Sequence, residues 1–251
     1  MWKESDDVQA NTLRTLTVLH ALRQDWGGAL IVSCGLGPQG AALAFAANIA
    51  GAVCLSLEPD PDTLRQSLRS GACDFIVNTL DEALRTIKNE VRKHQPLSVG
   101  LEGNSAALLQ ELLDRGVAPE LCAELSADLA ASHDEALRHF QSQGTTIIGL
   151  SPAPRIEGAV NAYALLDALL QQKQWQLASF SFATSSALRA FEAKALTALP
   201  TDEALRRKWL QAASKILPRE GTHRRLLWLT EEEEHSLQAQ LLEPTGAGPK
   251  S

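Results

Sequence analysis

The 251-residue sequence lacks an excess of basic residues, since 23 Lys and Arg stand against 30 Asp and Glu and the formal net charge is −7. Nucleic-acid binding needs a basic surface that follows the phosphates, and no basic stripe is present, so we expect no nucleic-acid partner. With 45% hydrophobic and 21% charged residues, the composition is typical of a folded, soluble domain and not of a disordered chain.

Paired cysteines are also absent. The four cysteines are scattered and form no CxxC motif, which argues against a disulfide framework and against a zinc site. Free cysteines of this kind are usually small buried hydrophobic residues, and they fit a reducing compartment, so we expect a cytoplasmic protein without a metal site. Cys34 needs separate attention, because it ends a predicted strand beside a helix N-terminus that would lower the pKa of its thiol. The other three are Cys54, Cys73 and Cys122.

The sequence has no long uninterrupted hydrophobic run. The stretch Trp26–Leu57 carries no charged residue, but glycines and a proline within residues 35–40 divide it into two short pieces. Each piece falls below the roughly 20 residues that a membrane-spanning helix needs. The N-terminus also lacks the basic and apolar regions of a signal peptide. We therefore expect neither membrane insertion nor secretion by that route.

What the sequence does contain is an alternation of short apolar runs with helical segments, after an opening amphipathic helix at Val8–Leu22. Strands interleaved with helices in this way form a parallel sheet that is covered on both faces. The expected strands are Ala29–Cys34, Ala52–Leu57, Cys73–Val77, Leu97–Leu101, Leu121–Leu125 and Thr145–Leu150. The expected helices are Gln39–Ala50, Thr63–Ser70, Leu80–Lys93, Asn104–Arg115 and Ser132–Gln143.

A boundary is expected at Pro152 and Pro154, where the strand pattern largely stops. Beyond it we expect one strand, Arg224–Leu229, and a helix opened by a capping box of Thr230 and Glu233. The other helices expected there are Glu157–Gln172, Ser185–Ala198 and Thr201–Ile216. The expected organisation is an N-terminal helix at 1–25, a dinucleotide-binding domain at 26–151, a mostly helical extension at 152–242 and a disordered tail at 243–251.

A GxGxxG motif occupies Gly35–Gly40, immediately after a predicted strand and at the start of a predicted helix. In this context the glycines permit a tight turn, close approach of a pyrophosphate and packing of the helix on the strand. Glu58 ends the next strand, and 58 − 35 = 23 is near the spacing of an acid that binds the adenosine ribose and favours NAD over NADP. The motif predicts a Rossmann-like, doubly wound parallel sheet of about six strands with a dinucleotide site. A glycine-rich turn without a ligand is the alternative.

Three segments resemble the central NAD-binding domain of urocanase, or urocanate hydratase: Trp26–Ala42, Ala50–Glu58 and Leu97–Ala106. Their order and spacing match those of the family, and a weaker similarity extends to about Leu150. In this family NAD is an electrophile, whose nicotinamide ring is attacked by the imidazole of urocanate before water adds, in histidine catabolism. The resemblance therefore implies NAD as the cofactor and an imidazole-bearing small molecule as a further partner.

Carried over by position, the resemblance implies a set of cofactor-binding residues. The glycine turn would hold the pyrophosphate, Glu58 the ribose, and the helix start at Asn104 and Ser105 the nicotinamide half, with Ser126 as a further hydrogen-bonding contact. For Asn104 a plain N-cap role is an equal alternative. The full set is Gly35, Gly37, Pro38, Gln39, Gly40, Glu58, Asn104, Ser105 and Ser126. No catalytic residue is assigned.

Three positions depart from the family pattern. Pro38 removes one backbone donor from the phosphate turn, Thr63 stands where the family has Arg, and the segment Glu124–Asp128 lacks the family's His. The family's catalytic Cys and much of its substrate pocket also belong to flanking domains with no counterpart here. We therefore expect a stand-alone NAD-binding domain without a complete urocanate hydratase site. Two alternatives stay open. One is an active hydro-lyase completed by a partner chain. The other is a pseudoenzyme that forms a homodimer and serves as an interaction or sensor module, with a decayed dinucleotide site.

Two histidines lie on one predicted helix, His133 and His139. They are six residues apart, whereas metal ligands on one helix face lie three or four residues apart. We therefore interpret His133, Asp134, Glu135 and His139 as a solvated helix face.

Overall fold

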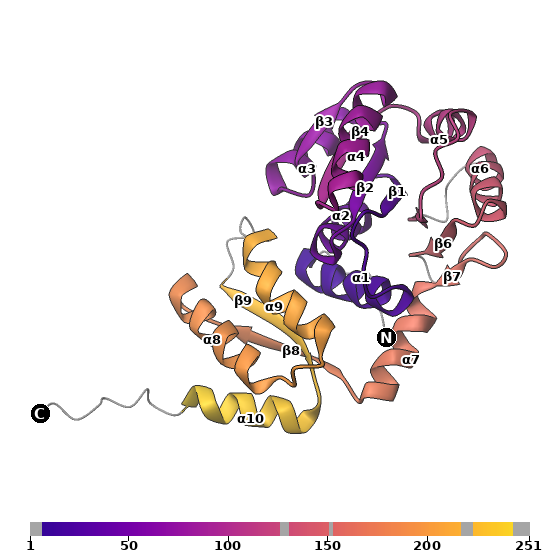
Figure 1. Ribbon diagram of the computed structural model, residues 1–251. Helices are drawn as coiled ribbons and strands as arrows, with labels where there is room; N and C mark the ends of the chain where they lie inside the picture. Colours follow the sequence, from indigo (N-terminus) through magenta and orange to yellow (C-terminus); the bar gives the residue numbers. More distant parts are fainter. Residues whose placement is uncertain (1–6, 126–130, 151–152, 217–222, 243–251) are drawn as a thin grey trace, which may run out of the picture.

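The computed structural model describes residues 7–125, 131–150, 153–216 and 223–242 (Figure 1). Seven strands form one parallel sheet in the order β3-β4-β2-β1-β5-β6-β7. The predicted doubly wound parallel sheet is confirmed, with one strand more than expected. The strands are β1 (Leu30–Cys34), β2 (Val53–Glu58), β3 (Phe75–Val77), β4 (Leu97–Glu102), β5 (Leu121–Glu124), β6 (Thr146–Gly149) and β7 (Val160–Asn161).

Strand β1 lies at the centre of the sheet, between β2 and β5. Each residue of β1 and β2 is buried, which explains why both strands are continuous apolar runs in the sequence. The chain runs outward from β1 on one side, through β2, and resumes on the other side at β5. The carboxyl ends of β1 and β5 therefore border the point where the strand order reverses, and ligands of open α/β sheets bind at such a point.

Helices cover both faces of the sheet. On one face, Ile31 and Cys54 belong to a hydrophobic cluster with α1 and α2, while on the other face Val32 and Leu55 pack with α4, α5 and α6. These alternating positions follow the two-residue period of a strand. The helices of this region are α1 (Val8–Leu22), α2 (Pro38–Ala50), α3 (Pro61–Ser70), α4 (Leu80–Lys93), α5 (Ser105–Asp114) and α6 (Ala131–Ser142).

The C-terminal part combines helices with a separate antiparallel pair of strands, β8 (Gln176–Ser181) and β9 (Arg224–Leu229). Strand β9 and the capping box of Thr230 and Glu233 at the start of α10 confirm the predictions. The expectation that strands largely stop after residue 152 was wrong for β7 and β8. The helices here are α7 (Ala162–Lys173), α8 (Ser185–Ala198), α9 (Ala204–Ile216) and α10 (Glu231–Leu242).

The two missed strands have physical reasons. Strand β7 is only two residues long, and Asn161 at its end caps α7 by accepting a hydrogen bond from Ala164 N at 3.0 Å, so α7 begins later than predicted. In β8 only Ala178 and Phe180 are buried. The remaining positions are exposed, and three of the six residues are polar, so the sequence offered no apolar run to detect.

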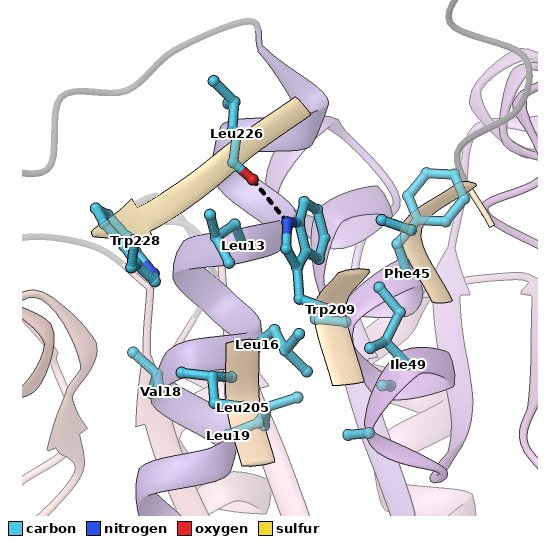
Figure 2. Close-up of a cluster of buried hydrophobic side chains, with 14 of the residues drawn as sticks. Leu13, Leu16, Val18, Leu19, Phe45, Ile49, Leu205, Trp209, Leu226 and Trp228 are labelled. Atoms are coloured by element: carbon cyan, nitrogen blue, oxygen red, sulfur yellow. Dashed lines mark hydrogen bonds between the residues drawn. The ribbon is translucent and has the colours of Figure 1, made fainter. Parts of the chain in front are cut away.

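Helix α1 joins the sheet to the C-terminal part. It packs on α2 and also contacts α7, α9 and β9, and Figure 1 shows it between the sheet and the C-terminal elements. Figure 2 shows the shared core, in which Trp209 of α9 donates its indole N–H to Leu226 O of β9 at 2.7 Å. Leu13 and Leu16 of α1 and Phe45 of α2 line the same cluster. One hydrophobic core therefore spans both parts.

Within the described ranges, no helix combines the length and the apolar composition needed to cross a bilayer. The predicted tail at 243–251 lies outside the described residues.

Candidate functional site

The glycine turn joins β1 to α2 with very little space between them. Gly35 has a φ of +112°, a conformation that favours glycine. A Cβ added to Gly40 would lie 2.2 Å from Gly35 O, far inside contact distance. Gly35 and Gly40 are therefore required by the fold itself, one for the backbone angle and the other for the approach of helix to strand.

Gly37, between them, has no such internal requirement. Its φ is −57°, which other residues adopt readily, and a Cβ added there would meet no described atom within 4 Å. It is exposed at the N-terminus of α2. The described residues leave the space beside Gly37 open at the carboxyl edge of the sheet, so a ligand can approach the backbone at this point.

The N-terminus of α2 presents unused polar groups. Gly37 is the N-cap and Pro38 the first helical residue, and among the described residues no side chain caps the helix. Gln39 Oε1 is buried, and no described group donates a hydrogen bond to it. A helix N-terminus carries partial positive charge and free N–H groups, which favour an anion.

Glu58 ends β2 and is 7% exposed. Its carboxylate accepts hydrogen bonds from Leu36 N at 2.7 Å and from Asp60 N at 2.9 Å. One oxygen thus holds the glycine turn, and the other orders the start of α3. The sequence predicted the place of this acid at the edge, but spacing could not show that its oxygens are already engaged by backbone donors.

The end of β4 adjoins the end of β2, because Glu58 and Glu102 are register partners and Gly103 N donates to Glu58 O at 3.1 Å. Asn104 therefore lies next along the same edge. It is the N-cap of α5, accepting from Ala107 N at 3.0 Å through its side-chain oxygen. The capping role for Asn104, one of the two interpretations from sequence, is thus observed, and its side-chain NH2 group is not needed for the cap.

Ser105 and His133 form a buried pair that the sequence did not indicate. Ser105 Oγ lies 2.7 Å from His133 Nε2, and the residues are 9% and 7% exposed. The interpretation of His133 as part of a solvated helix face was wrong, whereas Glu135 and His139 are exposed as expected. The spacing of residues on α6 carried no information about Ser105, which lies on α5 and packs against α6.

A second polar cluster lies at the end of β5. Glu124 is almost completely buried, and Arg155 N donates to both of its oxygens at 3.2 Å. The Arg155 guanidinium pairs with Asp134 of α6 and lies 3.8 Å from Glu124. These contacts tie the segment after β6 to the edge beside the glycine turn. A signal was present, since Glu124 is an acid that ends an apolar run, but Arg155 is too distant in sequence to be linked to it.

The predicted site residues thus gather on one edge, from the ends of β1, β2 and β4. Ser126 lies outside the described residues. Among the residues that are described, no group of three His, Cys, Asp or Glu side chains is placed to hold a metal ion.

A family model described as the urocanase Rossmann-like domain matches residues 9–147. This chain belongs to the urocanase family. The match includes α1, which the sequence analysis had set apart, and ends in β6. The urocanase Rossmann-like domain therefore contains the glycine turn, Glu58 and the Ser105–His133 pair, whereas β8, β9 and α7 to α10 lie beyond it.

Similarity to solved structures is weak. An alcohol dehydrogenase from Thermus sp. ATN1 has 14% identity and a TM-score of 0.35. The match covers 64% of this chain and 45% of the dehydrogenase chain. A SAM-dependent methyltransferase from Thiobacillus denitrificans, solved with S-adenosyl-L-homocysteine, has 17% identity and a TM-score of 0.35. The match covers 85% of this chain and 88% of the methyltransferase chain. TM-scores this low carry no functional information about this urocanase-type chain.

The thiols of this urocanase-type domain are protected by burial. All four cysteines are free and buried. Burial raises the pKa of the Cys34 thiol to about 12, contrary to the lowering that the neighbouring helix N-terminus suggested. Desolvation of the thiolate outweighs the helix dipole, because Cys34 faces the core under β1. Cys34 is therefore not an activated nucleophile.

We expect Gly40→Ala and Gly37→Ala to differ sharply in stability. The methyl group at residue 40 must displace Gly35 O, so we expect a loss of about 1–3 kcal/mol or more in the free energy of unfolding. At residue 37 the methyl group enters open space, so we expect a change below about 1 kcal/mol. Urea denaturation of both variants measures this. If both variants lose the same free energy of unfolding, the fold itself requires glycine at residue 37, and Gly37 is not explained by the approach of a ligand.

We expect all four thiols to resist Ellman's reagent at pH 8 in the native protein and to react on unfolding. The pKa of Cys34 is about 12 when folded and about 8.5 when unfolded. Its contribution to stability is therefore complete below about pH 8.5 and is lost as the pH rises toward 12. If the native protein is labelled rapidly, and this labelling is lost in the Cys34→Ala variant, the Cys34 thiol is not buried and the prediction is wrong.

Proposed function

We propose that this urocanase-type domain binds NAD on the carboxyl edge of the sheet, with the pyrophosphate over Gly37–Gly40. The observation that carries the proposal is Gly37. The fold requires glycine at both ends of the turn, but at residue 37 the backbone angle is ordinary and no described atom lies within 4 Å of an added Cβ. A glycine in that place is explained by a ligand that must approach the backbone closely.

The residues around the turn fit a dinucleotide. The N–H groups of Gln39 and Gly40, at the uncapped start of α2, suit the pyrophosphate. Pro38 supplies no donor, and the side chain of Gln39 adds a polar group with an unused buried oxygen. Bound there, NAD supplies an electrophilic nicotinamide ring. The protein's part is to hold and orient the cofactor.

The nicotinamide half would lie along the end of β4. The NH2 group of Asn104 is left for a ligand by the capping bond, which uses only the side-chain oxygen. Ser105 is held by His133 at 2.7 Å, so its hydroxyl has a fixed direction. We assign these residues to positioning of the cofactor.

The domain alone is proposed to lack a complete hydratase site. None of the four thiols is available as an acid or nucleophile, because all are buried, and the family's His after β5 is missing. The buried, free thiols also support a reducing compartment, which we propose to be the cytoplasm. An active lyase completed by a partner chain would need that partner to bring the missing groups.

One observation favours a second candidate, an interaction module that has lost dinucleotide binding. Both oxygens of Glu58 accept backbone hydrogen bonds, and Pro38 removes a donor from the turn. A carboxylate engaged in this way is less available to a ribose. Direct measurement of NAD binding separates the two candidates.

We expect NAD to stabilise the full chain in a thermal shift or calorimetric titration. With a micromolar Kd, millimolar NAD adds about 4 kcal/mol to the stability of the folded state. We expect Gly37→Val to abolish the effect while the protein stays folded. The control Thr201→Val, in the exposed turn between α8 and α9, should preserve it. Wild-type protein that gains no stability from millimolar NAD would favour the interaction module.

We expect the purified chain, supplied with NAD, not to hydrate urocanate. Positioning of reacting groups is worth roughly 7–11 kcal/mol of a barrier, and a domain that holds only the cofactor does not position the substrate. The assay follows the loss of urocanate absorbance, with a full-length urocanase as the positive control. Turnover that survives re-purification and is abolished by Gly37→Val would establish the lyase instead.

A further inference from the structure

The turn between β4 and α5 presents a serine in the way that hydrolases present a nucleophile. Strand β4 ends at Glu102, and α5 begins at Ser105. Between them Gly103 has a φ of +150°, so the unusual backbone angle falls on the glycine two residues before the serine. In α/β hydrolases the nucleophile is a serine placed after Gly-x, between a strand and a helix. Ala107 stands where that motif has its second glycine.

A histidine lies against this serine. The Ser105 Oγ atom is 2.7 Å from His133 Nε2 of α6, and no other described residue hydrogen-bonds to the Ser105 hydroxyl. In the tautomer that carries its proton on Nδ1, the imidazole accepts the hydroxyl hydrogen through Nε2. A serine that donates to an imidazole nitrogen within 2.6–3.2 Å has the geometry of a nucleophile paired with its general base.

The backbone at the start of α5 supplies hydrogen-bond donors beside the serine. The Asn104 cap uses Ala107 N, and Leu108 N donates to Asn104 O. The N–H groups of Ser105 and Ala106 have no acceptor among the described residues. In hydrolases of this layout, the N–H of the residue after the serine stabilises the oxyanion that forms on the attacked carbonyl. Ala106 N takes that place here.

The burial of the pair limits the substrate. Ser105 and His133 are 9% and 7% exposed, while Asn104 beside them is exposed and Ala106 is half-buried. A carbonyl group can therefore approach from the carboxyl edge of the sheet, but the nearly buried hydroxyl leaves little room for a long chain on the acyl side. The leaving group, in contrast, can extend into solvent.

We propose that Ser105 and His133 form a hydrolytic dyad that acts on esters of short-chain carboxylic acids. Ser105 Oγ attacks the acyl carbon and forms a bond to it, while His133 Nε2 takes the hydroxyl proton. The bond between the acyl carbon and the leaving alkoxide then breaks, and the alkoxide takes the proton from His133. The products of this half are an alcohol and an acyl group on Ser105.

Water completes the reaction. His133 Nε2 takes a proton from water, and the water oxygen attacks the acyl carbon. The bond from the acyl carbon to Ser105 Oγ breaks, and the Oγ atom takes the proton back from His133. The net reaction converts an ester and water into a carboxylic acid and an alcohol, without a cofactor or a change of oxidation state.

The start of α8 offers an internal comparison. Its first residue is also a serine, Ser185, and the preceding Thr184 caps the helix by accepting from Ala187 N at 3.1 Å. Ser185 is exposed, and no described histidine hydrogen-bonds to it. The two serines thus occupy the same helix position with the same kind of cap, and they differ in the histidine partner and in burial.

The inference goes beyond NAD binding and is tested without NAD, so its failure leaves the result of the NAD titration untouched. The full chain is treated with p-nitrophenyl acetate, and peptide mass spectrometry locates the acetyl groups over time. A positioned base accelerates such a step about 10²–10⁴-fold, so we expect Ser105 to be acetylated about 10²-fold faster than Ser185. If Ser105 carries no acetyl group, or if both serines react equally fast, the proposal is overturned.

The second test removes the base. Gln can hydrogen-bond to Ser105 but cannot take its proton, so we expect His133→Gln to slow acetylation of Ser105 about 10²-fold. The matched control is His139→Gln, which changes an exposed histidine of the same helix and should leave the rate unchanged. Circular dichroism checks that both variants are folded. A folded His133→Gln variant that acetylates at the wild-type rate would show that His133 is not the base.

The third test keeps the nucleophile but changes its atom. A thiol beside an imidazole also attacks acyl groups, so we expect Ser105→Cys to be acetylated at residue 105. A hydroxyl that only ties α5 to α6 would give no such reaction, and an unreactive, folded Ser105→Cys variant would contradict the dyad. The comparison of Ser105 with Ser185 in the wild-type chain decides the proposal even if a variant fails to fold.

Discussion

The contact between the end of β1 and the start of α2 determines the rest of the site. Gly35 O and the position that a Cβ would take at Gly40 are only 2.2 Å apart, so helix and strand meet without any side chain between them. This closeness fixes the direction of α2 and turns its N-terminus toward the carboxyl edge. Glu58 secures the arrangement from β2, by accepting a hydrogen bond from Leu36 N inside the turn.

Around this contact the parallel sheet brings together groups from distant parts of the sequence. The end of β4 lies beside Glu58, and α5 begins there with Asn104 as its cap. The Ser105–His133 bond then links α5 to α6. The edge therefore combines one open, positively polarised helix start with side chains already held by hydrogen bonds, which suits a site that binds and orients a cofactor.

Much of this fold is predictable, for reasons visible in particular residues. The buried strands β1 and β2 are charge-free runs, because both of their faces meet helices. Strand β8 escaped prediction, because only Ala178 and Phe180 are buried in it. The positions of the site residues follow from spacing, whereas their contacts do not. The sequence could place Glu58 at the edge, but it could not show that the carboxylate oxygens accept hydrogen bonds from Leu36 N and Asp60 N. It also gave no sign that His133 contacts Ser105.

The central claim is that an anion of a dinucleotide rests on the open backbone beside Gly37. Amide chemical shifts of the isotope-labelled chain, followed during addition of NAD, test it most directly. The account predicts the largest changes at the N–H groups of Gly37, Gln39 and Gly40, with smaller ones at Asn104 and Ser105. Changes centred elsewhere, such as the turn between α7 and β8, or no changes at residues 37–40 at millimolar NAD, would contradict it.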